Sequence, residues 1–143
     1  MTSGVLINPK SGRGNGKGQA LAAQLKASPH VKMHMLSAFG ELEPALRRFA
    51  QEGVTDLFIS SGDGTVQAIQ TLLAEKNIFA QRPRIGLLPH GTTNMTAADI
   101  GYRTRNIAAQ AAFIAAPSPR ELHARPTLRA VNPRDGLVRH GMF

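Results

Sequence analysis

The chain of 143 residues has no cysteine and no tryptophan, and tyrosine occurs once. Without cysteine there is neither a disulfide framework nor a thiolate metal site, which fits a reducing compartment. No apolar run approaches the roughly 20 residues that a membrane-spanning helix needs, and the first residues lack the basic and apolar regions of a signal peptide. We therefore expect a cytoplasmic protein, long enough to bury a real core.

Acidic residues are also scarce, since nine of them accompany 17 lysine and arginine residues and leave a net charge of +8. The imbalance is greatest after Gly101, where seven arginines accompany only Glu121 and Asp135. A basic surface attracts nucleic acid, nucleotides or anionic lipid, and a merely solvated face is an equal alternative. Because Tyr102 is the aromatic residue near these arginines, we expect no nucleic-acid partner. Peripheral contact with an anionic inner-membrane surface and a homodimer both stay open.

The most informative stretch is the glycine-rich turn Ser60-Ser61-Gly62-Asp63-Gly64-Thr65. It follows the apolar run 57–59 and precedes the amphipathic run 66–73, so it is typical of a strand, a turn and the start of a helix. Bare N–H groups at a helix N-terminus form an anion site. Asp63 suits an anion that arrives with a metal ion, so the turn predicts a nucleotide–magnesium site. The alternative is that Asp63 only caps the helix or closes an Asx-turn.

Strand and helix patterns alternate along most of the chain. We expect strands at 4–7, 31–36, 56–60 and 85–88, and helices at 19–27, 41–51, 66–73, 93–99 and 105–115, with Thr104 as the N-cap of the last. This alternation predicts an α/β fold with a parallel sheet and right-handed crossovers. Ligands then bind beyond the carboxyl ends of the strands, where the unusual turns 8–18, 60–65 and 89–94 fall.

The last part of the chain has a different character. The segments 122–131 and 137–143 predict two strands, joined by a turn that contains Asp135-Gly136. An isolated hairpin is marginally stable in water. We therefore expect an α/β nucleotide-binding domain over 1–118, and over 119–143 the start of an incomplete β-rich domain.

Several familiar motifs are missing. The loop 8–18 is neither a Walker A motif nor a dinucleotide fingerprint, and the sequence has no zinc spacing and no Gly-x-Ser-x-Gly elbow. Lys10 is a candidate phosphate contact, whereas Arg13 and Lys17 are better explained as solvated charges. His90 could bind phosphate or sugar, but a lone loop histidine is more often a polar surface group.

Three segments carry a family resemblance. Asn8-Pro9-Lys10-Ser11-Gly12 resembles Asn-Pro-x-Ser-Gly, Ser61–Thr65 resembles Gly-Gly-Asp-Gly-Thr, and Leu88–Asn94 resembles Leu-Pro-x-Gly-Thr-x-Asn. In this order they resemble the catalytic domain of the diacylglycerol kinase family, which includes sphingosine and ceramide kinases. The resemblance implies a Rossmann-like, three-layer N-terminal domain of the phosphofructokinase and NAD-kinase type.

By the same resemblance, the cofactors are ATP and Mg²⁺, and Asp63 is the catalytic and metal-binding candidate. The implied ligand-binding residues are Asn8, Pro9, Lys10, Ser11, Gly12, Ser37, Gly62, Asp63, Gly64, Thr65, Gly91, Thr92 and Asn94. Two positions depart from the pattern. Ser61 stands in place of a glycine, and Met95 stands in place of an aspartate.

The implied function is transfer of the ATP γ-phosphate to a lipid hydroxyl, such as that of diacylglycerol. The family's second domain, a β-sandwich, supplies the acidic general base, so we expect this chain alone to be inactive. An NAD kinase-like enzyme and a non-catalytic nucleotide-binding module are the alternatives, and the two departures favour the second of these.

Overall fold

The computed structural model describes residues 1–91, 105–116, 124 and 127–142. Its centre is a four-stranded sheet with the order β2-β1-β3-β4, in which every neighbouring pair is parallel. The strands are β1 (Ser3–Ile7), β2 (Lys32–Met35), β3 (Asp56–Ser60) and β4 (Arg84–Leu88). The predicted parallel α/β fold is confirmed, with each strand within one residue of its predicted bounds at either end.

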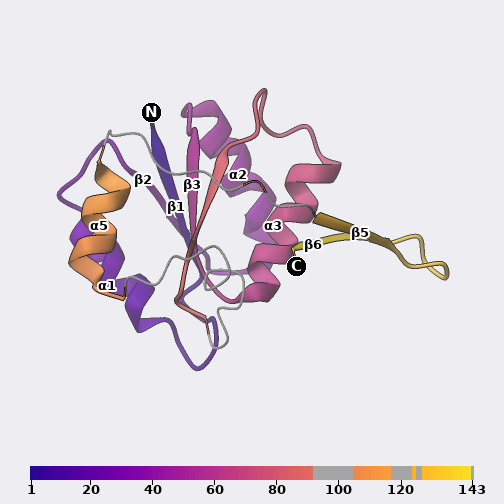
Figure 1. Cartoon of the computed structure of the whole chain (residues 1–143), viewed down its shortest axis with the longest axis horizontal. Helices are drawn as coiled ribbons and strands as arrows, with labels where there is room; N and C mark the ends of the chain where they lie inside the picture. Colours follow the sequence, from indigo (N-terminus) through magenta and orange to yellow (C-terminus); the bar gives the residue numbers. More distant parts are fainter. Residues whose placement is uncertain (92–104, 117–123, 125–126, 143) are drawn as a thin grey trace.

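Helices cover both faces of this sheet and make a three-layer structure (Figure 1). One face carries α1 (Gly16–Leu25) and α5 (Ile107–Ala115), and the other carries α2 (Leu42–Gln51) and α3 (Asp63–Glu75). All residues of β1 and β3 are buried, as expected for central parallel strands covered on both sides. Among the described helices, none is long and apolar enough to cross a membrane.

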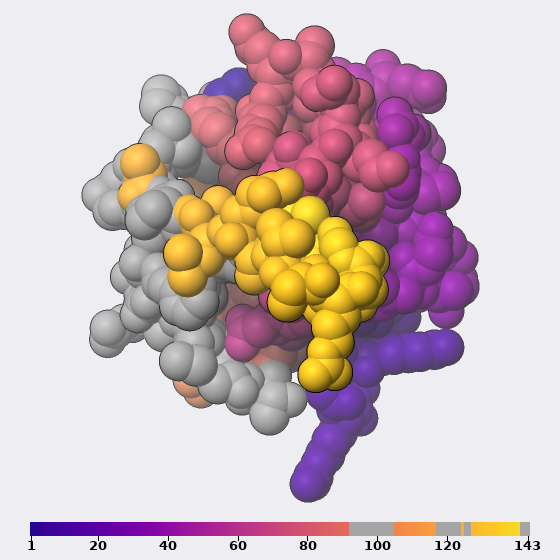
Figure 2. Space-filling model, turned by 90° about the vertical axis from the view of Figure 1, so that its right-hand side faces the viewer, coloured from indigo at the N-terminus to yellow at the C-terminus, as the bar shows by residue number. Residues whose placement is uncertain are grey.

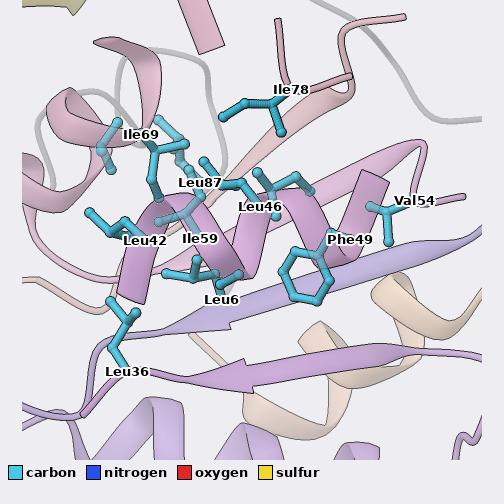
Figure 3. Close-up of a cluster of buried hydrophobic side chains, with 13 residues drawn as sticks. Leu6, Leu36, Leu42, Leu46, Phe49, Val54, Ile59, Ile69, Ile78 and Leu87 are labelled. Atoms are coloured by element: carbon cyan, nitrogen blue, oxygen red, sulfur yellow. The ribbon is translucent and has the colours of Figure 1, made fainter. Parts of the chain in front are cut away.

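The α2–α3 side holds the larger buried cluster (Figure 3). On α2 the predicted periodicity is confirmed, because its buried positions repeat at the helical spacing that forms one apolar stripe. These side chains pack against β1, β3 and α3, and the labelled members of the cluster are Leu6, Leu36, Leu42, Leu46, Phe49, Val54, Ile59, Ile69, Ile78 and Leu87.

The sequence-based helix bounds were wrong by two residues at the ends of α1 and α3, and by more at their starts. Helix α1 begins at Gly16 instead of residue 19, because the Asn15 side chain accepts a hydrogen bond from the Gly18 N–H at 2.8 Å and caps the helix. Helix α3 begins at Asp63, three residues before the predicted run. The N-cap of α5 is Asn106 and not Thr104, since Asn106 accepts from the Ala109 N–H. The predicted helix 93–99 lies outside the described residues.

Strands β5 (Thr127–Val131) and β6 (Val138–Met142) form the predicted antiparallel hairpin. Figure 2 shows this hairpin, in yellow, lying against the segment that contains α3. The His140 N–H donates to Thr71 Oγ1 at 2.9 Å, and His140 Nε2 lies 2.6 Å from Glu75 Oε1. The hydrogen bond with His140, and then that from Arg129, hold the pKa of Glu75 below its ordinary value. The division at residue 118 stays a prediction.

The edge of the sheet opposite the three turns contains a buried ion pair. The Asp56 side chain is 4% exposed, and Arg84 makes two contacts with it, Nε to Oδ1 at 2.5 Å and Nη2 to Oδ2 at 2.8 Å. Asp56 begins β3 and Arg84 begins the neighbouring β4, where the register places them opposite each other. The pair therefore joins two adjacent strands at their start.

We predict that Arg84→Ala lowers the free energy of unfolding by about 2–4 kcal/mol, because it removes a cation that makes two contacts with a buried carboxylate. The control is Arg47→Ala, which removes an exposed pair with Glu43 one helical turn away and should cost less than about 0.5 kcal/mol. Urea denaturation of both variants measures the difference. Equal losses would contradict a special role for the buried pair.

Candidate functional site

The sheet order places the predicted site at its topological switch point. From β1 the chain passes outward to β2, and then crosses back to β3 and β4 on the other side of β1. The loops that follow β1, β3 and β4 therefore emerge at one edge, next to one another, where open parallel sheets bind ligands. The predicted meeting of the three turns is confirmed for the part of each that the structure describes.

Asn8 joins the first loop to the central turn. Its backbone N–H donates to the Ser60 carbonyl at 2.9 Å, and its side-chain Nδ2 donates to Thr65 Oγ1 at 3.2 Å. Its Oδ1 accepts from the Lys10 N–H at 3.1 Å, which closes an Asx-turn. The structure thus brings Asn8, Lys10 and Thr65 together as predicted, and it gives Asn8 a positioning role that the sequence did not reveal.

Asn15 is the residue that the sequence analysis missed. It is 2% exposed, and its Nδ2 lies within hydrogen-bond distance of the Asn8 carbonyl, the Ser60 carbonyl and Ser60 Oγ, at 3.1, 3.2 and 2.9 Å. Its backbone N–H donates to the Pro9 carbonyl at 2.9 Å. The available signal was an asparagine just before a helix, which is a preferred N-cap.

The first loop needs glycine at two places. Gly12 has φ +61° and Gly14 has φ +114°, conformations that side chains with a Cβ rarely adopt. Gly12 is exposed, so its backbone faces solvent at the site. Ser11, between Lys10 and Gly12, is buried, and within the described part of the chain its Oγ has no hydrogen-bond partner.

The central turn exposes its carboxylate. Gly62 is the N-cap of α3 and Asp63 is its first residue, so the alternative in which Asp63 caps the helix is wrong. Asp63 and Gly64 are exposed, and Asp63 has no hydrogen bond or ion pair among the described residues. The first N–H groups of a helix lack partners within it, so the Asp63 carboxylate lies beside donors that the helix itself does not satisfy. Ser61 is buried at 4% exposure, and its Oγ has no partner in the described residues.

His90, in the third turn, is neither a surface group nor free to bind phosphate. It is 7% exposed, its Nδ1 lies 2.7 Å from Ser60 Oγ, and its Nε2 lies 2.8 Å from Gln110 Oε1 on α5. Burial lowers the pKa of His90, so the imidazole is neutral near pH 7. Gly91 follows and is half-buried. Thr92 and Asn94 lie outside the described residues.

Ser37, the candidate ligand contact after the second strand, lies beside the first loop. The Lys10 Nζ donates to the Ser37 carbonyl at 3.5 Å, and the Ser37 N–H donates to Glu41 Oε2 at 3.0 Å. Glu41 also contacts His34 Nε2 at 3.1 Å. The Ser37 N–H first, and the His34 ring second, lower the pKa of Glu41. Lys10 is exposed and holds Ser37 only by a long hydrogen bond, so its ammonium group can turn toward an anion.

A groove of about 520 Å³ borders the central turn on the α3 side. It lies between the start of α2, the length of α3 and β6, and Gly64 belongs to its lining. Its walls combine apolar and polar side chains, and they are formed by Phe39, Gly40, Leu42, Glu43, Gly64, Gln67, Ala68, Thr71, Leu72, Val138 and Arg139. The described residues contain no cluster of three histidine or carboxylate groups that could hold a metal ion by themselves.

The sequence and the structure are similar to those of proteins described as lipid kinases. The sequence model of the diacylglycerol kinase catalytic domain matches residues 2–124. A relative described as "Probable lipid kinase YegS-like" from Enterobacter sp. (strain 638) is 37% identical over 62 residues, which cover 43% of this chain and 20% of the relative. A crystal structure of a diacylglycerol kinase from Bacillus anthracis str. Sterne aligns with a TM-score of 0.61 and 26% identity, over 80% of this chain and 41% of that one.

A substitution at Gly18 tests the hydrogen bonds around Asn15. A Cβ at this position would lie 2.5 Å from both Asn15 Nδ2 and Ser60 Oγ. We therefore predict that Gly18→Ala lowers the free energy of unfolding by about 1–3 kcal/mol, although alanine is the better helix former. Gly16→Ala is the matched control, because nothing lies within 4 Å of its Cβ position, and it should stabilise by up to about 1 kcal/mol. Thermal unfolding that ranks the two variants alike would contradict the close packing.

Proposed function

The chain belongs to the diacylglycerol kinase catalytic domain family, a family of lipid kinases, and we propose that it forms the ATP-binding part of an enzyme that transfers the γ-phosphate to a lipid hydroxyl. The observation that carries this proposal is the meeting of three motif turns at one edge of the sheet, with Asp63, which has no partner among the described residues, at the start of α3. The aligned part covers 41% of the solved relative.

The chemistry of the central turn favours a phosphate accompanied by a cation. The N-terminus of α3 attracts an anion through its N–H groups and its dipole. Asp63 alone would repel that anion. Mg²⁺ removes the conflict, because it is commonly bound by one or two carboxylates together with phosphate oxygens and water. Asp63 would hold this ion, whose contribution is to neutralise charge on the phosphates.

Around that ion, the remaining motif residues would position the triphosphate. Backbone N–H groups of Gly12, Gly62 and Gly64 are the proposed donors to phosphate oxygens, and Lys10 supplies a mobile positive charge. Pro9, Ser11, Ser37 and Gly91 shape the surrounding loops. Thr92 and Asn94 complete the proposed site on the strength of the motif alone.

The groove beside Gly64 has the character of a nucleoside site. Small-molecule sites combine apolar walls with a few polar groups that fix orientation. Here Phe39, Leu72 and Val138 supply apolar area, and Gln67 supplies an amide for hydrogen bonding. Because the groove starts at the central turn, a triphosphate on that turn would place its base within reach of these walls.

Phosphoryl transfer also needs a group that accepts the proton of the lipid hydroxyl while the bond between the γ-phosphorus and the bridging oxygen breaks. The carboxylates near the start of α2 are already engaged, since Glu41 contacts His34 and Glu43 contacts Arg47. Asp63 is the residue proposed to bind the cation. The family resemblance places the general base in a further domain, so we propose that this chain supplies the donor side of the reaction.

A lipid acceptor requires access to a membrane. The exposed apolar residues of the hairpin, Leu128, Val131 and Leu137, lie among arginines in a chain of net charge +8. We therefore include peripheral contact with an anionic membrane in the proposal. A non-catalytic nucleotide-binding module is the second candidate, and the replacements at Ser61 and Met95 favour it.

We predict that Asp63→Asn weakens binding of Mg²⁺·ATP by about tenfold or more, because the cation loses its carboxylate. In EDTA the same change should leave ATP binding unchanged or strengthen it, since the repulsion between carboxylate and phosphate is gone. Glu52→Gln, at the exposed end of α2, is the matched loss of charge and should change neither value. Calorimetry in both buffers measures this, and an Asp63→Asn variant with normal Mg²⁺·ATP affinity would refute the proposed metal role.

A product assay tests the proposal that this chain binds the phosphate donor but does not activate the lipid hydroxyl. Incubated with radiolabelled ATP, Mg²⁺ and vesicles of diacylglycerol, the 143-residue chain should bind ATP but yield no labelled phosphatidic acid, because the group that activates the hydroxyl lies elsewhere. Labelled lipid would show that the chain is sufficient and contradict this prediction. Labelled NADP from a parallel incubation with NAD would instead favour the NAD kinase-like alternative.

A further inference from the structure

One buried chain of hydrogen bonds connects all three turns of the site. Asn15 Nδ2 contacts Ser60 Oγ at 2.9 Å, Ser60 Oγ contacts His90 Nδ1 at 2.7 Å, and His90 Nε2 contacts Gln110 Oε1 at 2.8 Å. None of these four residues is more than 7% exposed. The chain runs from the cap of α1 through the end of β3 and the turn after β4 to α5, and the proposed phosphate-transfer chemistry uses none of it.

The partners fix where the protons lie. Gln110 Oε1 is an acceptor, so Nε2 of His90 carries the proton and donates to it. Nδ1 is then an acceptor and receives the Ser60 hydroxyl proton, while Ser60 Oγ accepts from Asn15. This arrangement keeps both hydrogen bonds of the ring only when the imidazole is neutral. A proton on Nδ1 would leave the Ser60 hydroxyl without its acceptor and would bury a positive charge among neutral partners.

We infer that His90 is a positioning residue. When its ring is neutral, it holds the third turn against the first loop and the central turn in the arrangement that binds nucleotide. When the ring is protonated, it releases the third turn. The inference rests on the proposed nucleotide function. It follows from the place of the ring, because His90 is joined to Ser60, whose carbonyl accepts from Asn8, and is followed directly by Gly91 of the third motif.

The electrostatic surroundings set the sign of the pH dependence. Burial is the main cause of the lowered pKa of His90, the hydrogen bond to Gln110 opposes it, and the positive charge of Lys17 on α1 adds to it. The partners from β3 and α5, Ser60 and Gln110, are neutral. The pKa of His90 in the folded protein is depressed. The stabilisation that the neutral ring gives to the arrangement of the three turns is therefore fully present above the ordinary pKa of about 6.5, and it is lost as the pH falls through the lowered pKa.

The test is Mg²⁺·ATP affinity measured by calorimetry between about pH 8 and about pH 5. The wild-type chain should lose about tenfold in affinity toward acid pH. His90→Asn keeps an acceptor oxygen for Ser60 but does not titrate, so its profile should vary by only about twofold. His90→Ala should bind more weakly than His90→Asn at every pH. His30→Asn replaces an exposed histidine whose ring contacts the Ala115 carbonyl, and it should keep the wild-type profile.

Nuclear magnetic resonance gives a second measurement that needs no nucleotide. In the wild-type chain, the His90 ring nitrogens should report the Nε2–H tautomer, and the amide signals of Gly62, Gly64 and Gly91 should titrate together with the ring. In His90→Asn these amide signals should stay constant over the same range.

The outcomes separate the two proposals. A wild-type chain that binds no nucleotide at any pH refutes the proposed function, and the amide titration then decides the role of His90 alone. A wild-type chain that binds nucleotide while His90→Asn retains the acid loss refutes the positioning role and leaves the nucleotide function intact. Amide signals that stay constant in the wild-type chain while His90 titrates would also overturn the inference.

Discussion

The site depends on how the carbonyl groups at the ends of β1 and β3 are satisfied. In a parallel sheet these groups leave the ladder at one edge, and a buried carbonyl without a donor is costly. The Asn15 side chain supplies donors to both Asn8 and Ser60, and its own oxygen caps α1. One side-chain amide therefore fixes the first loop, the central turn and the start of a helix. Position 18 needs glycine, because a Cβ there would collide with this amide.

The buried hydrogen bonds that hold the described parts of the three turns together involve no charged side chain, so the charged groups of the site remain available to a ligand. The buried contacts among the turns use amides, a hydroxyl and an imidazole, while Lys10 and Asp63 stay exposed at the surface of the same turns. Such a separation suits a ligand that carries its own strong charges, because the protein pays no cost for breaking an internal ion pair when the ligand arrives. We therefore expect rigidity and electrostatic attraction to respond to different substitutions.

The fold and the motif turns could be predicted from the sequence because they depend on local signals. Buried strands appear as apolar runs, and glycine and hydroxyl residues mark the turns, so the Asp63 turn was located correctly although its helix starts three residues early. What could not be predicted depends on contacts between distant segments. His90 looked like a surface residue until β3 and α5 placed Ser60 and Gln110 on its two nitrogens, and Asn15 looked like an ordinary member of the loop 8–18.

Helix α3 links the central turn, which is proposed to bind phosphate, to the hairpin. Its first residue is Asp63, while Thr71 and Glu75, two and three turns later, bind the backbone and the ring of His140 on β6. A helix of this length is stiff, so a shift of the hairpin is transmitted to its other end more readily than through a loop. The groove lies between these same elements. The part of the chain that would contact the acceptor side therefore shares one rigid element with the part that would hold the donor phosphates.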